Sequence, residues 1–196
     1  MKHLLSTAAA AAFLLCSGAC GLAGSKADPP PSGSGTAVSA AESAIRTWPA
    51  GARATARAMI DKYGEPDRLT EGALRWTGNG PWAKTIVHRR AWSPFLGNRT
   101  HDYLEQTVDY QIPRGRADEL RRFDERLEIN ERGGQLSAWS PSEPMNVLIL
   151  NMAHEIASGR RDARSARSFV AKAVEFSKAG KSSVYMERLL FPPGPK

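Results

Sequence analysis

Cysteine is almost absent from this sequence. Of its 196 residues only Cys16 and Cys20 are cysteines, and both stand near the N-terminus. If residues 1–19 are removed, one cysteine remains and no intramolecular disulfide can form, which excludes the disulfide-stapled secreted scaffolds. Long apolar runs are also scarce. The longest one, from Leu4 to Leu15, is shorter than the roughly 20 residues that span a bilayer as a helix.

The first 24 residues have the organisation of an export signal. Lys2 and His3 precede the apolar run, and small residues follow it. This order predicts a secretory signal peptide over residues 1–19, with a short N-terminal anchor helix as the competing interpretation. The small residues 17–19 suit both ordinary signal peptidase and the lipoprotein pathway, and either cleavage leaves Cys20 first.

The segment around Cys20 resembles a bacterial lipobox, although Ser17 stands where that motif usually has leucine. The resemblance implies that Cys20 carries lipid and attaches the protein to a membrane. Gly21 stands where an aspartate signals retention in the inner membrane of some bacteria, so its presence favours the outer membrane. Residues 20–45 are rich in Gly, Ser, Pro and Ala, which predicts a disordered tether, and residues 46–196 are expected to form one globular domain.

The charge of the chain is moderately basic. Without residues 1–19 the sequence has 26 Lys and Arg against 20 Asp and Glu. For an exported protein this balance favours anionic envelope material or a lipid surface as partner, and we expect no nucleic acid partner.

The periodicity of apolar residues predicts the secondary structure. Helical spacing occurs over residues 49–63, 117–123, 142–158 and 162–179. Alternation and turn residues predict strands over residues 73–77, 83–92 and 107–113, and a hairpin over residues 126–140. Since consecutive hairpins favour antiparallel pairing, we predict an α+β fold: an antiparallel sheet of about five strands with helices packed on one face.

Two resemblances accompany this pattern. The passage from a helix into "YGEPDRL" and a strand pair resembles the small outer-membrane lipoproteins that accompany barrel-assembly machinery, over about 40 residues. The segments "MIDKYGEP", "HDYLEQTVDYQIP" and "EPMNVLILNMAHEI" are similar to an uncharacterised family of exported bacterial proteins, over residues 57–191. That family implies an exported protein but no activity, so no functional residue follows from it.

No catalytic or metal signature is present. "HEIAS" has Ser158 where a zinc helix has its second histidine, a Gly-x-Ser-x-Gly elbow is missing, and the Gly-x-Gly of "TGNGPW" is followed by proline. We therefore expect no metal and no cofactor. A hydrolase remains as the alternative hypothesis, and it requires five side chains to meet in one concave pocket: His101, Asp102, Glu105, His154 and Glu155. The competing interpretation is a solvated face, with the last two beside Asn151 on the polar side of a helix.

The most distinctive segment is "RWTGNGPWAKTIVHRRAW", in which aromatic and basic residues alternate. On a strand, Lys84, His88 and Arg90 would line one side and Arg89 the other. Aromatic rings beside cations suit anionic glycans, peptidoglycan or acidic lipid. The predicted binding residues are Trp76, Trp82, Lys84, His88, Arg89, Arg90 and Trp92. The competing interpretation places the tryptophans in the core with the arginines extended over them.

These observations favour a lipid-anchored envelope protein that binds an envelope protein or an anionic polymer without catalysis. The exported hydrolase is the alternative. A structural role in an envelope complex is a third hypothesis, which would be marked by apolar exposure around Leu189, Leu190 and Phe191.

Overall fold

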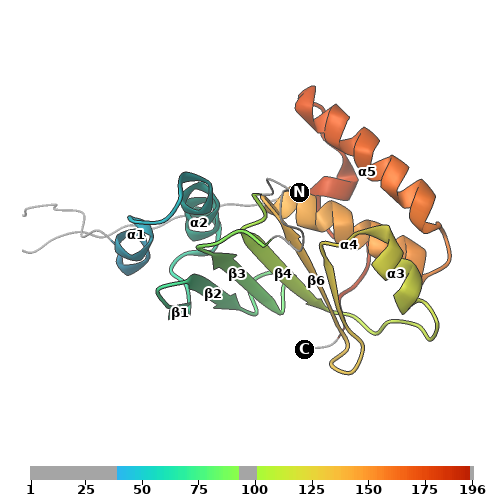
Figure 1. The fold of residues 1–196 in the computed structure, drawn as a ribbon, viewed down its shortest axis with the longest axis horizontal. Helices are drawn as coiled ribbons and strands as arrows, with labels where there is room; N and C mark the ends of the chain where they lie inside the picture. The colour runs from blue at the N-terminus through green and yellow to red at the C-terminus, as the bar shows by residue number, and fades with distance from the viewer. Residues whose placement is uncertain (1–38, 93–100, 195–196) are drawn as a thin grey trace, which may run out of the picture. The chain divides into compact units, whose positions relative to one another are not determined.

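The computed structural model describes residues 39–92 and 101–194, so the predicted signal peptide, Cys20 and most of the predicted tether lie outside the described residues. Its centre is an open antiparallel sheet with the strand order β1-β2-β3-β4-β6-β5 (Figure 1). The strands are β1 (Arg68–Leu69), β2 (Ala73–Thr77), β3 (Lys84–His88), β4 (Leu104–Asp109), β5 (Leu127–Asn130) and β6 (Gln135–Ser140). The predicted α+β class is confirmed.

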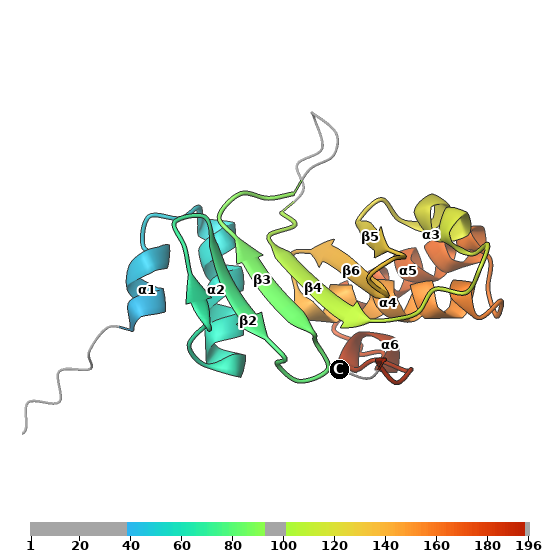
Figure 2. The ribbon, with the colours of Figure 1, turned by 90° about the horizontal axis from the view of Figure 1, so that it is seen from below.

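Helices cover one face of this sheet. They are α1 (Ala40–Ile45), α2 (Ala50–Tyr63), α3 (Ala117–Phe123), α4 (Glu143–Ala157), α5 (Ala163–Lys178) and α6 (Val184–Glu187). Helix α2 lies over the β1–β3 half and α4 over the β4–β6 half, and in the view from below the strands lie in front of both helices (Figure 2). Among the described residues, no helix packs on the opposite face.

Helix α2 forms the first of two hydrophobic clusters. Its alanine-rich sequence begins after Pro49 and ends at Gly64, whose φ of 77° is a conformation that glycine adopts without strain. Its buried residues pack on alternate residues of the strands below, because neighbouring strand residues point to opposite faces. The cluster contains Ala41, Ile45, Trp48, Ala52, Ala56, Met59, Leu74, Trp76, Val87 and Leu104.

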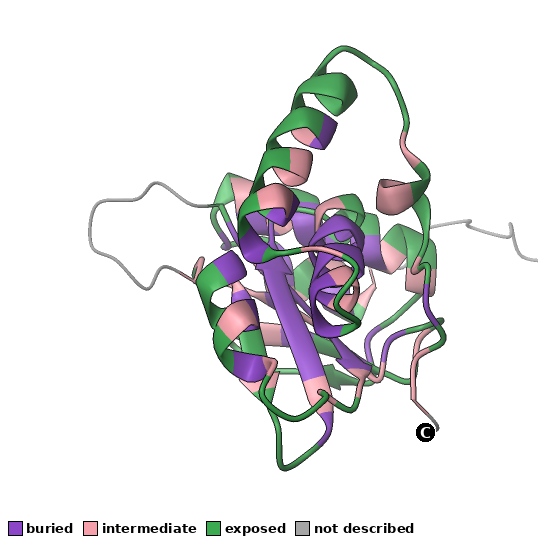
Figure 3. Ribbon diagram, turned by 90° about the vertical axis from the view of Figure 1, so that its right-hand side faces the viewer, coloured by how far each residue is buried: buried purple, intermediate pink, exposed green. Residues whose placement is uncertain are grey.

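Helix α4 is the centre of the second cluster. Eleven of its 15 residues are buried, because the sheet lies on one side of it and α3 and α5 pack on the other. Figure 3 colours much of α4 as buried and most of α5 as exposed. Helix α5 is thus an outer layer, and Asp162 accepts a hydrogen bond from the Ser165 N–H at its start (2.7 Å).

Several predicted boundaries were wrong. Helix α1 occupies part of the segment assigned to the tether, and the side chains of Ala41 and Ile45 are fully buried. The strand predicted over residues 107–113 is β4, which begins earlier, at Leu104, and ends at Asp109. Five of the six residues of β4 are buried, and three of these, Glu105, Gln106 and Thr107, are polar. The sequence therefore lacks the alternation of apolar and polar residues from which the first residue of a half-buried strand is predicted.

Asn151 was expected on the polar side of its helix and is instead only 1% exposed. Its side-chain amide donates to the carbonyls of Tyr185 and Arg188 (3.0 and 2.9 Å), and its Oδ1 accepts from the Leu190 N–H (2.7 Å). This one side chain fastens the C-terminal segment to α4. Of the three apolar residues that would mark a structural role, Phe191 is 6% exposed, Leu189 is partly buried and Leu190 is 39% exposed, so broad apolar exposure at this end is reduced to one side chain.

Within residues 39–92 and 101–194, none of the helices has the length and apolar character needed to cross a membrane.

Candidate functional site

The uncovered face of the sheet presents a row of opposed residues. Arg75 on β2 lies opposite Ile86 on β3, Ile86 opposite Glu105 on β4, and Glu105 opposite Trp139 on β6. Opposed residues in an antiparallel sheet share a face. Since Leu74, the neighbour of Arg75, is buried beneath α2, this row points away from the helices.

Glu105 is the centre of this face. Glu105 is 5% exposed, and its carboxylate pairs with Lys84 Nζ through Oε1 (2.7 Å) and with His88 Nε2 through Oε2 (3.0 Å). Burial by itself raises the pKa of a carboxyl group, but the hydrogen bonds from His88 and Lys84 outweigh it, and the pKa of Glu105 is lowered. The carboxylate therefore stays ionised and fixes two basic side chains side by side.

Aromatic rings pack beside these side chains, with Trp139 buried (8% exposed) and Trp92 partly exposed. The His88 ring lies 4.5 Å from the Trp139 ring at an interplanar angle of 30°, and the Trp92 ring stacks on Trp139 at 5.8 Å and 21°. We name Lys84, His88, Trp92, Glu105 and Trp139, together with Arg90, the open-face cluster. Sequence reasoning missed Trp139 because its partners come from β3 and from the segment after it, and only the strand register joins them.

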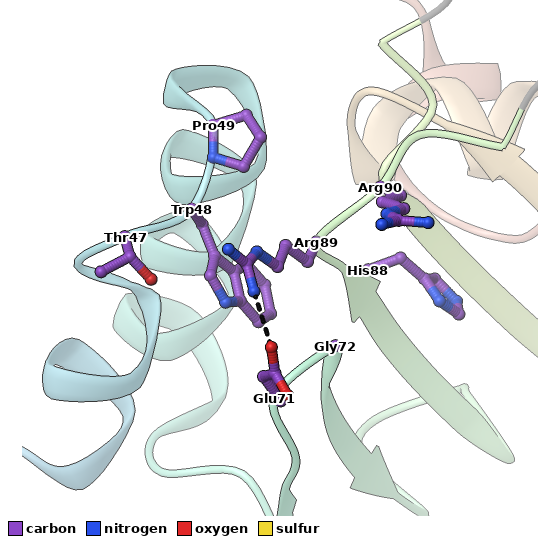
Figure 4. A pocket seen from close by; sticks show the side chains of 8 residues that line it. All are labelled: Thr47, Trp48, Pro49, Glu71, Gly72, His88, Arg89 and Arg90. Atoms are coloured by element: carbon purple, nitrogen blue, oxygen red, sulfur yellow. Dashed lines mark hydrogen bonds and ion pairs between the residues drawn. The ribbon is translucent and has the colours of Figure 1, made fainter.

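The two neighbouring arginines diverge as the alternation predicts. Figure 4 shows Arg89 extending toward Trp48 and Glu71, and its guanidinium pairs with the Glu71 carboxylate (3.2 Å). His88 and Arg90 point together to the other side (Figure 4). These side chains line an open cleft of about 850 Å³ whose remaining walls come from the α1–α2 connection and from Gly72.

Trp76 and Trp82 do not belong to this surface, so for them the prediction of a binding role is corrected. Trp76 is 2% exposed and donates to the Gly64 carbonyl (3.0 Å). Trp82 is fully buried, and its Nε1–H is shared by the Tyr63 hydroxyl and Glu143 Oε1, each at 3.1 Å. Both indoles lie on the helix-covered side, where they fill the core.

The residues of the hydrolase hypothesis are not brought together. Asp102 is 4% exposed and lies before β4, where burial raises the pKa of its carboxyl despite the charge of Arg126. His154 lies at the other end of that strand, where its Nδ1 bonds to the Tyr110 hydroxyl (2.9 Å). Since a strand rises about 3.3 Å per residue, positions 102 and 110 are about 26 Å apart along the chain.

The remaining members of that set also have other partners. Glu155 pairs with Arg161 (2.7 Å) and accepts a hydrogen bond from the Tyr185 hydroxyl (2.8 Å). The His101 ring contacts Tyr103 edge-on, with 6.3 Å between centroids. The five predicted side chains therefore occupy separate places on both sides of the sheet and at both ends of β4, and no common pocket contains them.

A buried carboxylate that sequence reasoning missed lies on the helix side. Glu143 Oε1 accepts from the Tyr63 hydroxyl (2.8 Å) and from Trp82 Nε1, and it pairs with Lys62 Nζ (3.1 Å). Burial and the hydrogen bond to Glu143 raise the pKa of Tyr63. The group joins α2, the β2–β3 connection and the start of α4, which makes it a structural junction between the two halves of the helical layer.

Within the described ranges, no group of three or more His, Cys, Asp or Glu side chains is arranged to hold a metal ion. The fold and the site together define an α+β protein with an open antiparallel sheet, whose uncovered face carries basic and aromatic side chains around one ionised carboxylate. Comparisons with protein-family models, with curated proteins and with solved structures found no match.

Proposed function

We propose that this chain is an exported envelope protein that binds an anionic polymer on the uncovered face of its sheet and has no catalytic activity. The observation that supports this proposal is the open-face cluster, in which Lys84, His88 and Arg90 lie on one side with Trp92 and Trp139. Cations beside aromatic planes bind acidic sugars and other polyanions through charge-assisted hydrogen bonds and stacking.

The position of the cluster also supports a polymer as ligand. The cations of the cluster are accessible, since Lys84 and His88 are partly exposed and Arg90 is exposed, although Glu105 and Trp139 beside them are buried. His88 and Arg90 also line the open cleft of about 850 Å³. An extended chain can lie across such a surface, whereas a small molecule is usually bound in a concave pocket that buries most of it. The hydrolase alternative has no comparable support, because its residues do not converge.

Export and lipid attachment complete the proposal. A signal peptide over residues 1–19, lipid on Cys20 and a tether would hold the domain at the periplasmic side of a membrane, and kinship with exported bacterial lipoproteins is part of the same proposal. The mass of the N-terminal peptide of protein recovered from its native membrane fraction tests it. Acyl and diacylglycerol mass on Cys20 is expected, and an unmodified N-terminus in a soluble fraction would refute the anchor.

Binding itself is tested with the full chain purified in detergent. Fluorescence anisotropy should show that labelled dextran sulfate binds, that neutral dextran does not, and that added salt weakens the complex. One surface cation contributes roughly 1 kcal/mol next to an anionic surface, so Arg90→Ala should weaken binding about fivefold. Arg164→Ala is the matched control, because Arg164 is an exposed arginine on α5, on the helical side.

Equal binding of dextran sulfate by the Arg90→Ala and Arg164→Ala variants would refute the proposed surface. Absence of any binding at low salt would refute the proposed function.

A further inference from the structure

Two arginines face each other beside the open-face cluster. Arg68 on β1 and Arg75 on β2 are directly opposed in the antiparallel register, and both are exposed. Opposed residues of such a pair have their Cβ atoms about 4.5–5.5 Å apart, and like charges in this position destabilise the pairing. We name these two residues the arginine pair.

The acidic side chains nearby are already engaged. Asp67 Oδ2 accepts from the Thr77 N–H (2.6 Å), and Glu71 pairs with Arg89 (3.2 Å). Glu105 is held by the basic residues of the open-face cluster. Among the residues that the structure describes, neither member of the arginine pair takes part in an ion pair.

Protection of the sheet edge does not account for both arginines. A charged residue on an edge strand discourages pairing with another chain, and β1 is an edge strand, so this role suits Arg68. Arg75 lies on β2, which has β1 on one side and β3 on the other. Its charge therefore adds repulsion within the sheet without protecting an edge.

We propose that the arginine pair binds a phosphomonoester group. Two guanidinium groups offer several N–H donors in the planar arrangement that pairs with phosphate oxygens. A phosphomonoester carries about −1.5 to −2 charges at pH 7 and so neutralises both arginines, whereas a carboxylate neutralises one. This inference rests on the proposed function, because it makes the phosphate the charged group of the anionic ligand, whose remainder extends over Ile86 toward Lys84.

The distance across the sheet fits such a ligand. Neighbouring strands lie about 4.8 Å apart, so the row from Arg75 through Ile86 and Glu105 to Trp139 extends over about 14 Å. Of this row, Arg75 is exposed and Ile86 is partly exposed, whereas Glu105 and Trp139 are buried. A phosphorylated chain would therefore contact the arginine pair and continue over Ile86 and Lys84.

Inorganic phosphate is the simplest probe. Isothermal titration of the full chain at low ionic strength should show binding that strengthens as the phosphate changes from its monoanion to its dianion. Arg68→Gln and Arg75→Gln should each weaken this binding at least tenfold. Arg132→Gln, in the exposed β5–β6 turn, should leave it unchanged and serves as the matched control.

Thermal denaturation separates loss of binding from loss of folding. Without phosphate, Arg75→Gln should unfold at the same temperature as the wild type or higher, because the substitution removes repulsion. Arg75→Glu should raise the unfolding temperature further through an ion pair with Arg68, and it should abolish phosphate binding. Phosphate should raise the unfolding temperature of the wild type but not that of these variants.

Vesicles and a soluble polymer distinguish the source of the phosphate. Binding to phosphatidic acid in phosphatidylcholine vesicles, with none to dextran phosphate, would identify a lipid headgroup. Binding to dextran phosphate in solution would identify a phosphorylated polymer. Absence of binding to inorganic phosphate and to both of these probes would overturn the inference, as would an Arg75→Gln variant that binds phosphate within twofold of the wild type or unfolds well below it.

The two proposals fail separately. If Arg90→Ala weakens dextran sulfate binding while Arg75→Gln keeps its phosphate affinity, the arginine pair is not the phosphate site and the proposed function stands. If polymers do not bind but inorganic phosphate binds through Arg68 and Arg75, the polymer function fails and the pair is a site for a small phosphate.

Discussion

Replacing Glu105 with glutamine should destabilise the fold, because Glu105 is the only acid of the open-face cluster. The change keeps the shape of the side chain and removes its charge between Lys84 and His88. Hydrogen bonds to a charged group contribute about 1.5–3 kcal/mol each. The side chains of Lys84 and His88 are 29% and 27% exposed, so their charges regain water when the partner is lost, and the burial cost of the carboxylate disappears as well.

These opposing terms leave an expected loss of about 2 kcal/mol in the free energy of unfolding at pH 7. For a protein of this size that loss corresponds to a decrease of about 4–8 °C in the unfolding temperature, measured by circular dichroism. Glu128→Gln is the matched control, because Glu128 lies on the same face opposite Ser137, is exposed, and has no ion pair among the described contacts. A change in Glu105→Gln no larger than that of the control would refute the reasoning.

The same variant predicts a pH dependence. The pKa of the Glu105 carboxyl is lowered in the folded state from its ordinary value of 4.5. The stabilisation is therefore fully present above the pKa of an unfolded glutamate, and it is lost as the pH falls through the lower folded-state pKa. The difference in stability between wild type and Glu105→Gln should be full at pH 7 and should vanish in strong acid. A difference that grows on acidification would contradict this sign.

Two further substitutions test the packing on the helix side. Asn151→Ala removes three hydrogen bonds to the C-terminal segment, so we expect the free energy of unfolding to decrease by about 2–3 kcal/mol. Hydrogen exchange of the Leu190 amide should become faster. Unchanged exchange there would contradict the role assigned to Asn151. Trp82→Phe removes the indole N–H that Glu143 and Tyr63 share. Chemical denaturation should show that the free energy of unfolding decreases by about 1–2 kcal/mol. An unchanged free energy of unfolding would mean that the indole N–H contributes little at this junction.

The sequence was most informative where an element repeats its period over several turns. The helices predicted over residues 142–158 and 162–179 are α4 and α5, each with one residue less at each end. Short elements were missed for a physical reason. β1 has two residues and α1 has six, so neither contains enough periods to reveal a buried face.

The candidate site was predictable only in part. Alternation along β3 placed Lys84 and His88 on one face and Arg89 on the other, as the structure has them. The residues that contact Lys84 and His88 from neighbouring strands could not be predicted from alternation, because they depend on the strand register. Glu105 meets Lys84 only through the pairing of β3 with β4, and Trp139 joins through the pairing of β4 with β6. Trp82 was misassigned because a tryptophan beside basic residues has the same local sequence in a core and on a surface.

The division of the core into two clusters has a consequence for how the domain opens. Leu104 belongs to the cluster under α2 and Val108 to the cluster under α4, so a single strand, β4, contributes to both. Tyr63 packs against both clusters as well. Each half contains its own helix and its own part of the sheet, which is the arrangement expected of two cooperative folding units joined by a shared strand. On the uncovered face, Glu105 of the shared strand pairs with Lys84 and His88, and the His88 ring contacts Trp139 on β6. These contacts couple the two units and oppose their separate opening.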